Sequence, residues 1–201
     1  MKYSYRLLPV LCMISLSASA QQSDVKANFW HPSHHHYEVI HAIEVESLVP
    51  MFFTGGYHIA VGYRYKRFRI RASVINGGTY DAEKAGIKNS SPEFKRYYTT
   101  SPGVFFGYNL WKNLELYTYL EFHTFKITQP NTGDKQNVTS IDTGLGISYQ
   151  FFIGQILYIQ PGVHLYLRSD HSANFNGTTY HTPNADLSPV IRVGARLWRK
   201  F

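Results

Sequence analysis

The chain has 201 residues, a formal net charge of +7 at pH 7 and a single cysteine, and 44% of its residues are hydrophobic and 16% aromatic. A basic balance is compatible with nucleic-acid binding. The charges, however, are dispersed along alternating segments, which favours an anionic lipid or lipopolysaccharide surface as partner instead. Beyond residue 20 no apolar run is long enough for a membrane helix, so a membrane protein of this composition would have to cross with strands.

The first residues have the form of an export signal. Lys2 and Arg6 precede the apolar run Leu7 to Leu16, and Ala18 to Ala20 has the small-x-small pattern of a signal-peptidase site. This predicts a signal peptide over residues 1–20, export, and a mature chain that begins at Gln21. Without Lys2 and Arg6 the mature chain carries a net charge of +5.

Two features near this segment bear on its chemistry. The one cysteine, Cys12, lies within the predicted signal peptide, so the mature chain has no disulfide or thiol chemistry. Residues 21–36 form a His-rich lead-in, expected in the periplasm, that contains His31 and His34 to His36, with His41 close behind. Neutral imidazole is a common metal ligand, but consecutive histidines in an unstructured segment are poorly spaced to close a site. We therefore expect no metal and no cofactor.

The remainder, residues 37–201, reads as alternating strands. We expect eight, over residues 37–48, 52–65, 67–77, 96–110, 114–127, 138–151, 155–168 and 187–201. Tight turns around Lys66, 111–113 and 152–154 alternate with links over 78–95, 129–137 and 169–186, which are longer and rich in turn-forming residues; the link 49–51 is a short exception. Short turns that alternate with long loops are typical of a transmembrane barrel, and an even strand count leaves both ends of the chain in the periplasm.

The last expected strand shows the alternation most clearly. From Leu187 to Leu197 the odd-numbered side chains are mainly apolar, and the segment closes on the aromatic Phe201. One face for lipid and one for a filled interior is what a barrel strand requires.

On these features the chain resembles the small eight-stranded outer-membrane barrels, the group that includes the membrane domain of outer-membrane protein A and its adhesin-like relatives. The resemblance covers about residues 37 to 201. It implies an all-β, antiparallel, up-and-down transmembrane barrel, and a terminal segment, Arg192 to Phe201, that acts as a signal to the barrel-assembly machinery. Arg199 departs from that signal, because an apolar residue is usual there.

Sorting the strands by parity separates apolar from ionisable side chains. The outward parity carries almost no charge; Lys126 and Arg199 fall there only near the rims, where the cost of facing lipid is small. Arg67 and Lys200 have the inward parity but lie at the periplasmic rim. The inward parity collects six bases and six acids: Arg64, Arg69, Arg71, Arg168, Arg192 and Arg196, with Glu38, Glu44, Glu46, Glu115, Glu121 and Asp142. Because buried charges need partners, we expect a network of ion pairs that plugs the lumen.

Prolines raise a difficulty within this scheme. Pro102, Pro161 and Pro189 fall inside expected strands, where each removes a ladder donor. We therefore expect bulges or kinks at these positions.

Three further groups could carry chemistry. The inward acids could act as general acids and bases, although their number matches the arginines and favours ion pairing. Inward His58, His123 and His164 could relay protons, but hydrogen-bonded filling of the lumen is the simpler interpretation. Ser172 with His171, Asp170 and His181, in the last long loop, has the residue types of a lipid A deacylase. The adjacent Ser and His, however, are poorly placed for catalysis.

The sequence thus predicts an integral outer-membrane barrel without enzymatic activity. Its expected role is structural, or consists of presenting external loops to lipopolysaccharide or other surfaces. A lipid A-modifying enzyme and a narrow channel remain the alternatives. Outer-membrane lipid, lipopolysaccharide and the assembly machinery are the expected partners; nucleic acid is not.

Overall fold

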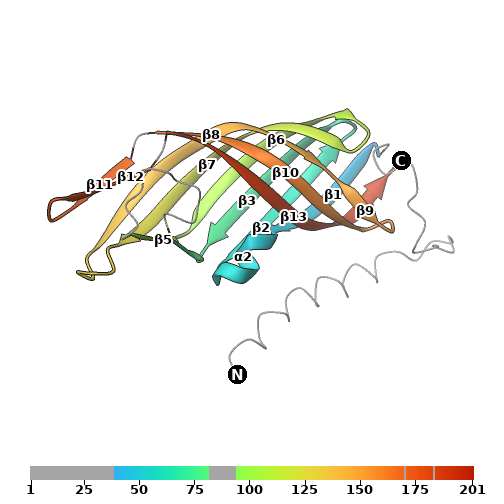
Figure 1. Cartoon of the computed structure of the whole chain (residues 1–201). Helices are drawn as coiled ribbons and strands as arrows, with labels where there is room; N and C mark the ends of the chain where they lie inside the picture. Colours follow the sequence, from blue (N-terminus) through green and yellow to red (C-terminus); the bar gives the residue numbers. More distant parts are fainter. Residues whose placement is uncertain (1–38, 82–93, 170, 183) are drawn as a thin grey trace, which may run out of the picture.

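A closed antiparallel barrel dominates the computed structural model, which describes residues 39–81, 94–169, 171–182 and 184–201 (Figure 1). In this part of the chain eight strands form the wall: β1 (His41–Leu48), β2 (Tyr57–Tyr65), β3 (Phe68–Asn76), β6 (Ser101–Trp111), β7 (Leu114–Thr128), β8 (Lys135–Tyr149), β10 (Leu157–Arg168) and β13 (Ala185–Lys200). Each pairs with the next, and β13 pairs with β1, which closes the sheet. The predicted eight-stranded up-and-down barrel is confirmed.

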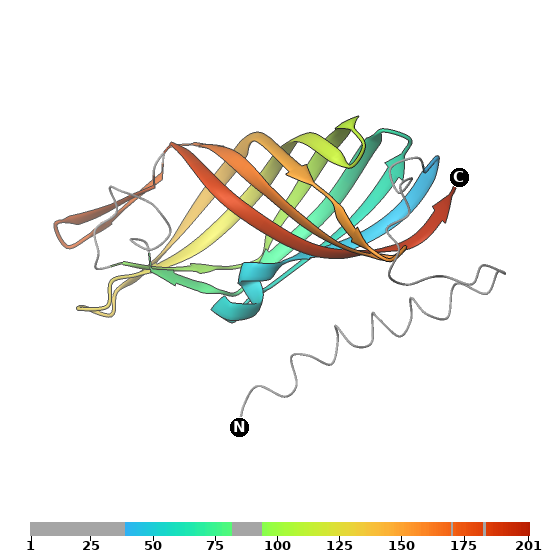
Figure 2. The same ribbon diagram turned by 45° about the vertical axis from the view of Figure 1, so that its right-hand side comes forward.

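Shorter elements extend the wall at its ends. β4 (Thr79–Asp81) pairs with β5 (Lys95–Tyr98), β5 pairs with the far part of β7, and β9 (Phe151–Ile153) pairs with β10. β11 (His171–Phe175) and β12 (Thr178–Thr182) form a separate hairpin at the end of the barrel opposite the C-terminus (Figures 1 and 2). The long links therefore gather at one end and the tight turns at the other, which is the expected asymmetry.

The first link differs from the prediction. Residues 49–54 form a short helix, α2 (Val49–Thr54), that ends on left-handed Gly55, and β2 starts only at Tyr57. Pro50 lies in the first turn of this helix, where its missing N–H costs nothing. The expected strand over 52–65 was therefore wrong in its first five residues.

Strict alternation positions the interior. In β2 every second side chain is buried, and β3, β6 and β7 follow the same pattern over most of their length. The buried parity of these strands carries the arginines and glutamates, whereas the exposed parity carries aliphatic and aromatic side chains. The predicted division between the two faces of the wall is confirmed for these strands.

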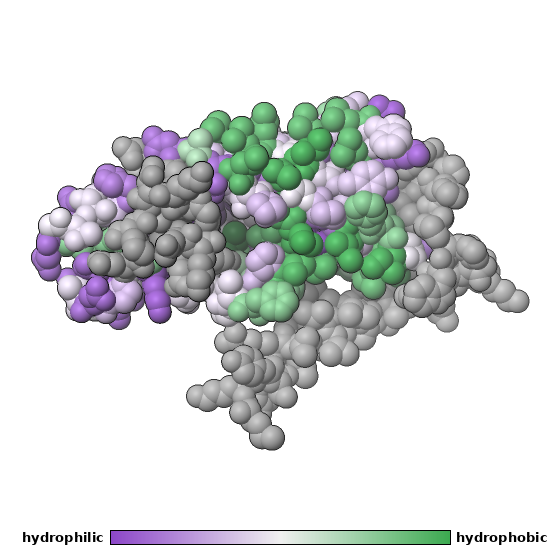
Figure 3. Space-filling view, viewed as in Figure 1, coloured by the Kyte–Doolittle hydropathy of each residue, from purple (hydrophilic) through white to green (hydrophobic). Residues whose placement is uncertain are grey.

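The outer surface is a broad apolar belt. Ile70, Phe106 and Leu145 are each between 46% and 54% exposed, and many other outward side chains resemble them. Figure 3 shows hydrophobic residues over the barrel wall and hydrophilic ones at the end that bears the long links. Such a wall suits lipid, since an arginine or lysine at the bilayer centre would cost about 2 to 4 kcal/mol. The described residues include no helix with the length and hydropathy of a membrane span.

The prolines fit without the bulges that the sequence suggested. Pro102 pairs with β3 but has no partner on β7, Pro161 pairs with β13 but not with β8 or β9, and Pro189 pairs with β10 but not with β1. In the described strands each proline therefore lies where the ladder is paired on one side only, and no register shift falls at any of the three.

A bulge occurs instead in the last strand. Ile43 of β1 pairs with Trp198, whereas the next residue, Glu44, pairs with Arg196, so that Leu197 is the extra residue. Because the side-chain period of a strand is two, one extra residue exchanges the two faces of everything beyond it.

The bulge corrects the parity of the terminal residues. Trp198 is 48% exposed on the outer face. Arg199 pairs with the fully buried Ala42 and donates hydrogen bonds to the carbonyl oxygen (3.1 Å) and to the side-chain oxygen of Gln155. The expectation that Arg199 faces lipid and Lys200 faces inward was wrong, because the register places them the other way round.

Candidate functional site in the barrel interior

Five arginines and three glutamates from five strands meet inside the barrel, and we call them the central network. Each is at most 5% exposed. They are Glu44 and Glu46 of β1, Arg64 of β2, Arg69 and Arg71 of β3, Glu115 of β7, and Arg192 and Arg196 of β13. Strand alternation places all of them on the inner face, and closure of the barrel brings them together.

Arg69 is the centre of this network. Its Nε lies 2.7 Å from Glu44, its Nη2 2.8 Å from Glu46 and its Nη1 3.3 Å from Glu115. Tyr158 joins the same group, because its hydroxyl accepts from Arg69 (2.9 Å) and donates to Glu46 (3.1 Å). One guanidinium therefore links three carboxylates that belong to opposite parts of the wall.

Arg71 lies beside it. Arg71 contacts Glu46 at 2.9 Å and Glu115 at 2.7 Å, so it spans from β1 to β7. Its guanidinium carbon also lies 4.8 Å from the ring centroid of Tyr117, and Arg192 lies 5.3 Å from the same ring. Aromatic faces therefore supplement the carboxylates as partners of these cations.

Arg64 and Arg196 lie nearer the short turns. Arg196 contacts Glu44 at 2.6 Å. Arg64 lies 3.5 Å from Glu44, and it donates hydrogen bonds of 2.8 Å to the side-chain oxygens of Asn109 and Gln150. The side-chain oxygens of these two amides thus supplement the glutamates as hydrogen-bond acceptors for Arg64.

Positive and negative charges are unequal within the central network, whereas the predicted six arginines and six acids were counted over the whole lumen. The central network holds five arginines but only three glutamates, and polar neutral groups complete the arginine contacts. The sequence analysis did not single out Asn109 and Gln150 among them, although both have inward parity within the expected strands 96–110 and 138–151. Glu38, one of the expected acids, lies outside the described residues.

The remaining predicted lumen residues form a second group nearer the long links. Arg168 lies 2.8 Å from Asp142, which also accepts a hydrogen bond from Ser140. Glu121 contacts His123 at 3.4 Å. We call this group the outer network; it contains two carboxylates, Asp142 and Glu121, and the arginine Arg168.

Arg96 of β5 was missed. It is 5% exposed, and its guanidinium carbon lies 4.8 Å from the ring centroid of Phe125 and 5.5 Å from that of Tyr98. Cation-π contact with two rings is a recognised environment for a buried arginine. On the single expected strand 96–110 the inward parity is odd, so Arg96 would point outward; it is buried because residues 95–98 form the separate strand β5, in which the even parity faces inward.

The three inward histidines each have a different partner. His58 accepts from the main-chain N–H of Leu48 at 3.1 Å, and His164 lies 2.8 Å from a guanidinium nitrogen of Arg192. His123 contacts Glu121, as described above. Each imidazole therefore belongs to its own set of contacts rather than to a relay of histidines.

The candidate catalytic group in the last long link is only partly described. Ser172 and His181 are directly opposite each other in the β11–β12 hairpin, and both are exposed. Asp170 and the side chain of His171 lie outside the described residues, as do His31 and His34 to His36. In the part of the chain that the structure covers, no group of three or more His, Cys, Asp or Glu is placed to hold a metal ion.

The geometry decides the class of protein. An antiparallel barrel that closes on itself leaves no strand pairing open around its wall, its outer face is apolar, and its ionisable side chains point inward. A barrel that spans a membrane requires both the closed wall and the apolar outer face. The hydrocarbon of the bilayer can neither hydrogen-bond to unpaired backbone groups nor solvate charged side chains. The described chain is a closed eight-stranded antiparallel β-barrel with the apolar wall of a membrane-spanning barrel.

The comparisons with known proteins found similar proteins only among solved structures. No protein-family model matches the sequence, and the comparison with curated proteins gives no match. Neisserial surface protein A (NspA) is 15% identical over 80% of this chain and 97% of its own, with a TM-score of 0.44. The N-terminal barrel domain of Pseudomonas aeruginosa OprF is 12% identical over 77% and 96%, with a TM-score of 0.40. A major outer membrane protein from Thermus thermophilus is 13% identical over 78% and 98%, also with a TM-score of 0.40.

Proposed function

We propose that this barrel is an occluded, non-enzymatic outer-membrane protein whose external end interacts with lipopolysaccharide and other surfaces. Residues 1–20 serve as its signal peptide, residues 21–36 as a periplasmic lead-in, and the segment ending at Phe201 as its assembly signal. The ion-pair network inside the barrel has a structural role in this proposal.

The central network is the observation that supports an occluded lumen. An open pore would leave inward side chains accessible to water, but Arg64, Arg69 and Arg71 are at most 2% exposed. Their carboxylate partners lie on β1 and β7, and contacts such as Arg64–Glu115 join strands that do not pair with each other. An eight-stranded barrel is just wide enough for its interior to be filled in this way.

The external end has a packed core of its own. Phe94, Ile127 and Phe175 are each at most 2% exposed within a hydrophobic cluster that joins β7, β8 and the β11–β12 hairpin. Phe94 contacts Phe175 with ring centroids 5.0 Å apart. Loops held by such a core present a defined surface, as a binding face requires.

Three lysines at the same end favour lipopolysaccharide as one partner. Lys95, Lys126 and Lys135 are exposed on adjacent strands. The pairings place Lys95 and Lys135 on either side of Thr128 and on the same face as Lys126, beyond the outward Phe122. Cations directly above the apolar belt match the position of anionic headgroups in the outer leaflet.

Two measurements test the proposal. In planar bilayers the refolded protein should give no steady conductance, and stable open steps of the wild type would contradict occlusion. In titrations with lipopolysaccharide micelles, the triple variant Lys95→Gln/Lys126→Gln/Lys135→Gln should bind about tenfold more weakly. Arg67→Gln, at the opposite end, is the matched control. Equal affinity of the triple variant and the control would remove lipopolysaccharide as a partner of this face.

A further inference from the structure

The end of the barrel that bears the short turns is strongly basic. The turns between β2 and β3, β6 and β7, and β9 and β10, together with residues 199–201, contain five basic side chains and no Asp or Glu within the described residues. They are Lys66, Arg67, Lys112, Arg199 and Lys200. Because β1 starts and β13 ends here, an even-stranded barrel places this rim in the periplasm, beside the inner leaflet of the outer membrane.

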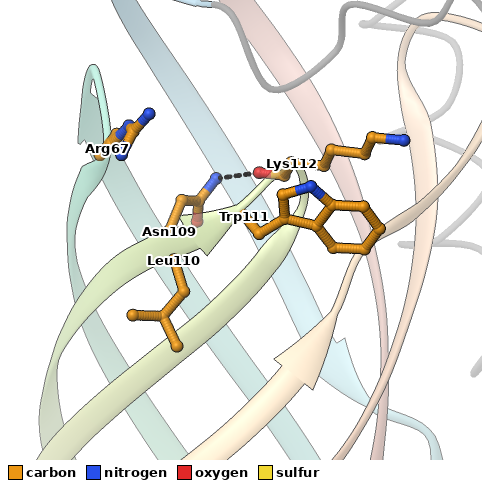
Figure 4. Close-up of a pocket in the computed structure, with 5 residues that line it drawn as sticks. All are labelled: Arg67, Asn109, Leu110, Trp111 and Lys112. Atoms are coloured by element: carbon orange, nitrogen blue, oxygen red, sulfur yellow. Dashed lines mark hydrogen bonds between the residues drawn. The ribbon is translucent and has the colours of Figure 1, made fainter.

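Two of these turns enclose a cleft of about 180 Å³ lined by Arg67, Asn109, Leu110, Trp111 and Lys112. Figure 4 shows Arg67 on one side and Trp111 and Lys112 on the other, with Asn109 between them. The Asn109 amide donates to the carbonyl oxygen of Lys112 at 3.1 Å and holds the turn in place. Arg67 and Lys112 are exposed on the two sides of the cleft, and the Lys112 side chain must turn from its position in Figure 4 for one anion to contact both.

An apolar groove lies next to this cleft on the lipid side. It has a volume of about 150 Å³ and is lined mainly by Tyr63, Tyr65, Phe68, Ile70 and Phe106. Phe68 follows Arg67 directly and packs edge to face on Tyr108, with ring centroids 5.0 Å apart. Phe68 therefore lines the groove directly beside Arg67 of the basic cleft.

The two turns use lysine where another residue would suit the backbone better. Lys66 and Lys112 have φ values of 50° and 48°, in the left-handed region that Gly and Asn adopt more readily. Each ammonium lies over an adjacent ring, 5.4 Å from the centroid of Tyr65 and 4.6 Å from that of Trp111. The geometry of the two turns does not explain why both have a lysine at this position. A requirement for positive charge at the membrane–water interface does explain it.

We infer that the cleft and the groove together bind one anionic phospholipid of the inner leaflet, of the phosphatidylglycerol type. Its phosphate contacts Arg67 and Lys112, and an acyl chain lies in the groove over Phe68 and Phe106. Charge complementarity selects the anionic headgroup, and the apolar groove beside the cleft selects a membrane lipid over a free anion. This site is separate from the lysines proposed for lipopolysaccharide, which lie at the opposite end.

Native mass spectrometry of the folded full chain tests the inference. The protein is released from micelles doped with equal amounts of phosphatidylglycerol and phosphatidylcholine, and retained lipids are counted. The wild type should retain phosphatidylglycerol in several-fold excess, and Arg67→Gln/Lys112→Gln should lose about tenfold of that preference. Lys126→Gln/Lys135→Gln removes the same charge at the far end and should keep it.

Three results would overturn the inference. The first is equal retention of the two lipids by the wild type, and the second is an unchanged preference in Arg67→Gln/Lys112→Gln. The third is displacement of the lipid by inorganic phosphate, which would identify a free-anion site. The unheated gel mobility of each variant shows that it is folded. Because the lipopolysaccharide titration uses other residues, either proposal can fail alone.

Discussion

The ring of Tyr158 on β10 covers Gly194 on β13, where a β-carbon would lie 2.4 Å from Cζ of the tyrosine. This close approach lets the Tyr158 hydroxyl reach both Arg69 and Glu46. The absence of one side chain on the wall therefore positions a hydrogen bond at the centre of the lumen.

Gly194→Ala should push the ring of Tyr158 aside and destabilise the barrel by about 1 to 3 kcal/mol, as is usual for overpacking. Urea unfolding in detergent measures this change. Shortening the facing side chain should relieve the clash, so that Gly194→Ala costs less in a Tyr158→Leu background. Additive effects of the two substitutions would show that the contact does not exist.

Glu44→Gln should be among the most damaging single changes. It removes the charge that faces Arg64, Arg69 and Arg196, all of them buried. Breaking a buried pair from one side costs about 3 to 5 kcal/mol. Asp186→Asn is the control: its side chain is 18% exposed and 3.8 Å from Arg168, so a loss below about 1 kcal/mol is expected. Similar unfolding free energies for both variants would contradict the buried network.

The bulge at Leu197 makes a prediction about neighbouring residues. A spin label on Trp198→Cys should be accessible to oxygen dissolved in the bilayer, whereas one on Arg199→Cys should be shielded, because residue 199 shares a face with the buried Ala42. Electron paramagnetic resonance in lipid vesicles reports both accessibilities. The reverse order would mean that β13 pairs with β1 without the extra residue.

Ser172→Ala and His181→Ala should leave the lipid A of the host unchanged. The two residues lie opposite each other but are exposed at the surface of a hairpin, and an activated serine needs a base held within hydrogen-bond reach. Mass spectrometry of lipid A incubated with reconstituted protein is the readout. Acyl release that either substitution abolishes would favour the enzyme alternative.

The wall of the barrel could be predicted from the sequence because alternation is a local property. Arg69 and Arg71 lie two residues apart, so their common face follows from the period of a strand wherever that strand pairs. The specific partners did not follow in the same way. Glu44 and Arg196 meet only because β1 closes on β13, and five arginines share three glutamates through amides and rings whose register no local pattern specifies.

Two other features could not be predicted from one segment of the sequence by itself. The apolar run from Val49 to Phe53 has no period of its own, so helix and strand were not distinguishable there. The bulge at Leu197 exists only relative to β1. By contrast, Asn176-Gly177, with φ values of 44° and 95° at the tip of the β11–β12 hairpin, is a recognised hairpin signal that the sequence did offer.

The central claim, that this chain is a closed and filled barrel in the outer membrane, is tested most directly by its migration on a denaturing gel with and without heating. A barrel with every wall strand paired resists detergent and stays compact. The purified membrane fraction should therefore give two apparent sizes, with the unheated form distinct from the heated one. A protein that fractionates with soluble periplasmic material and migrates at one size under both conditions would contradict the account.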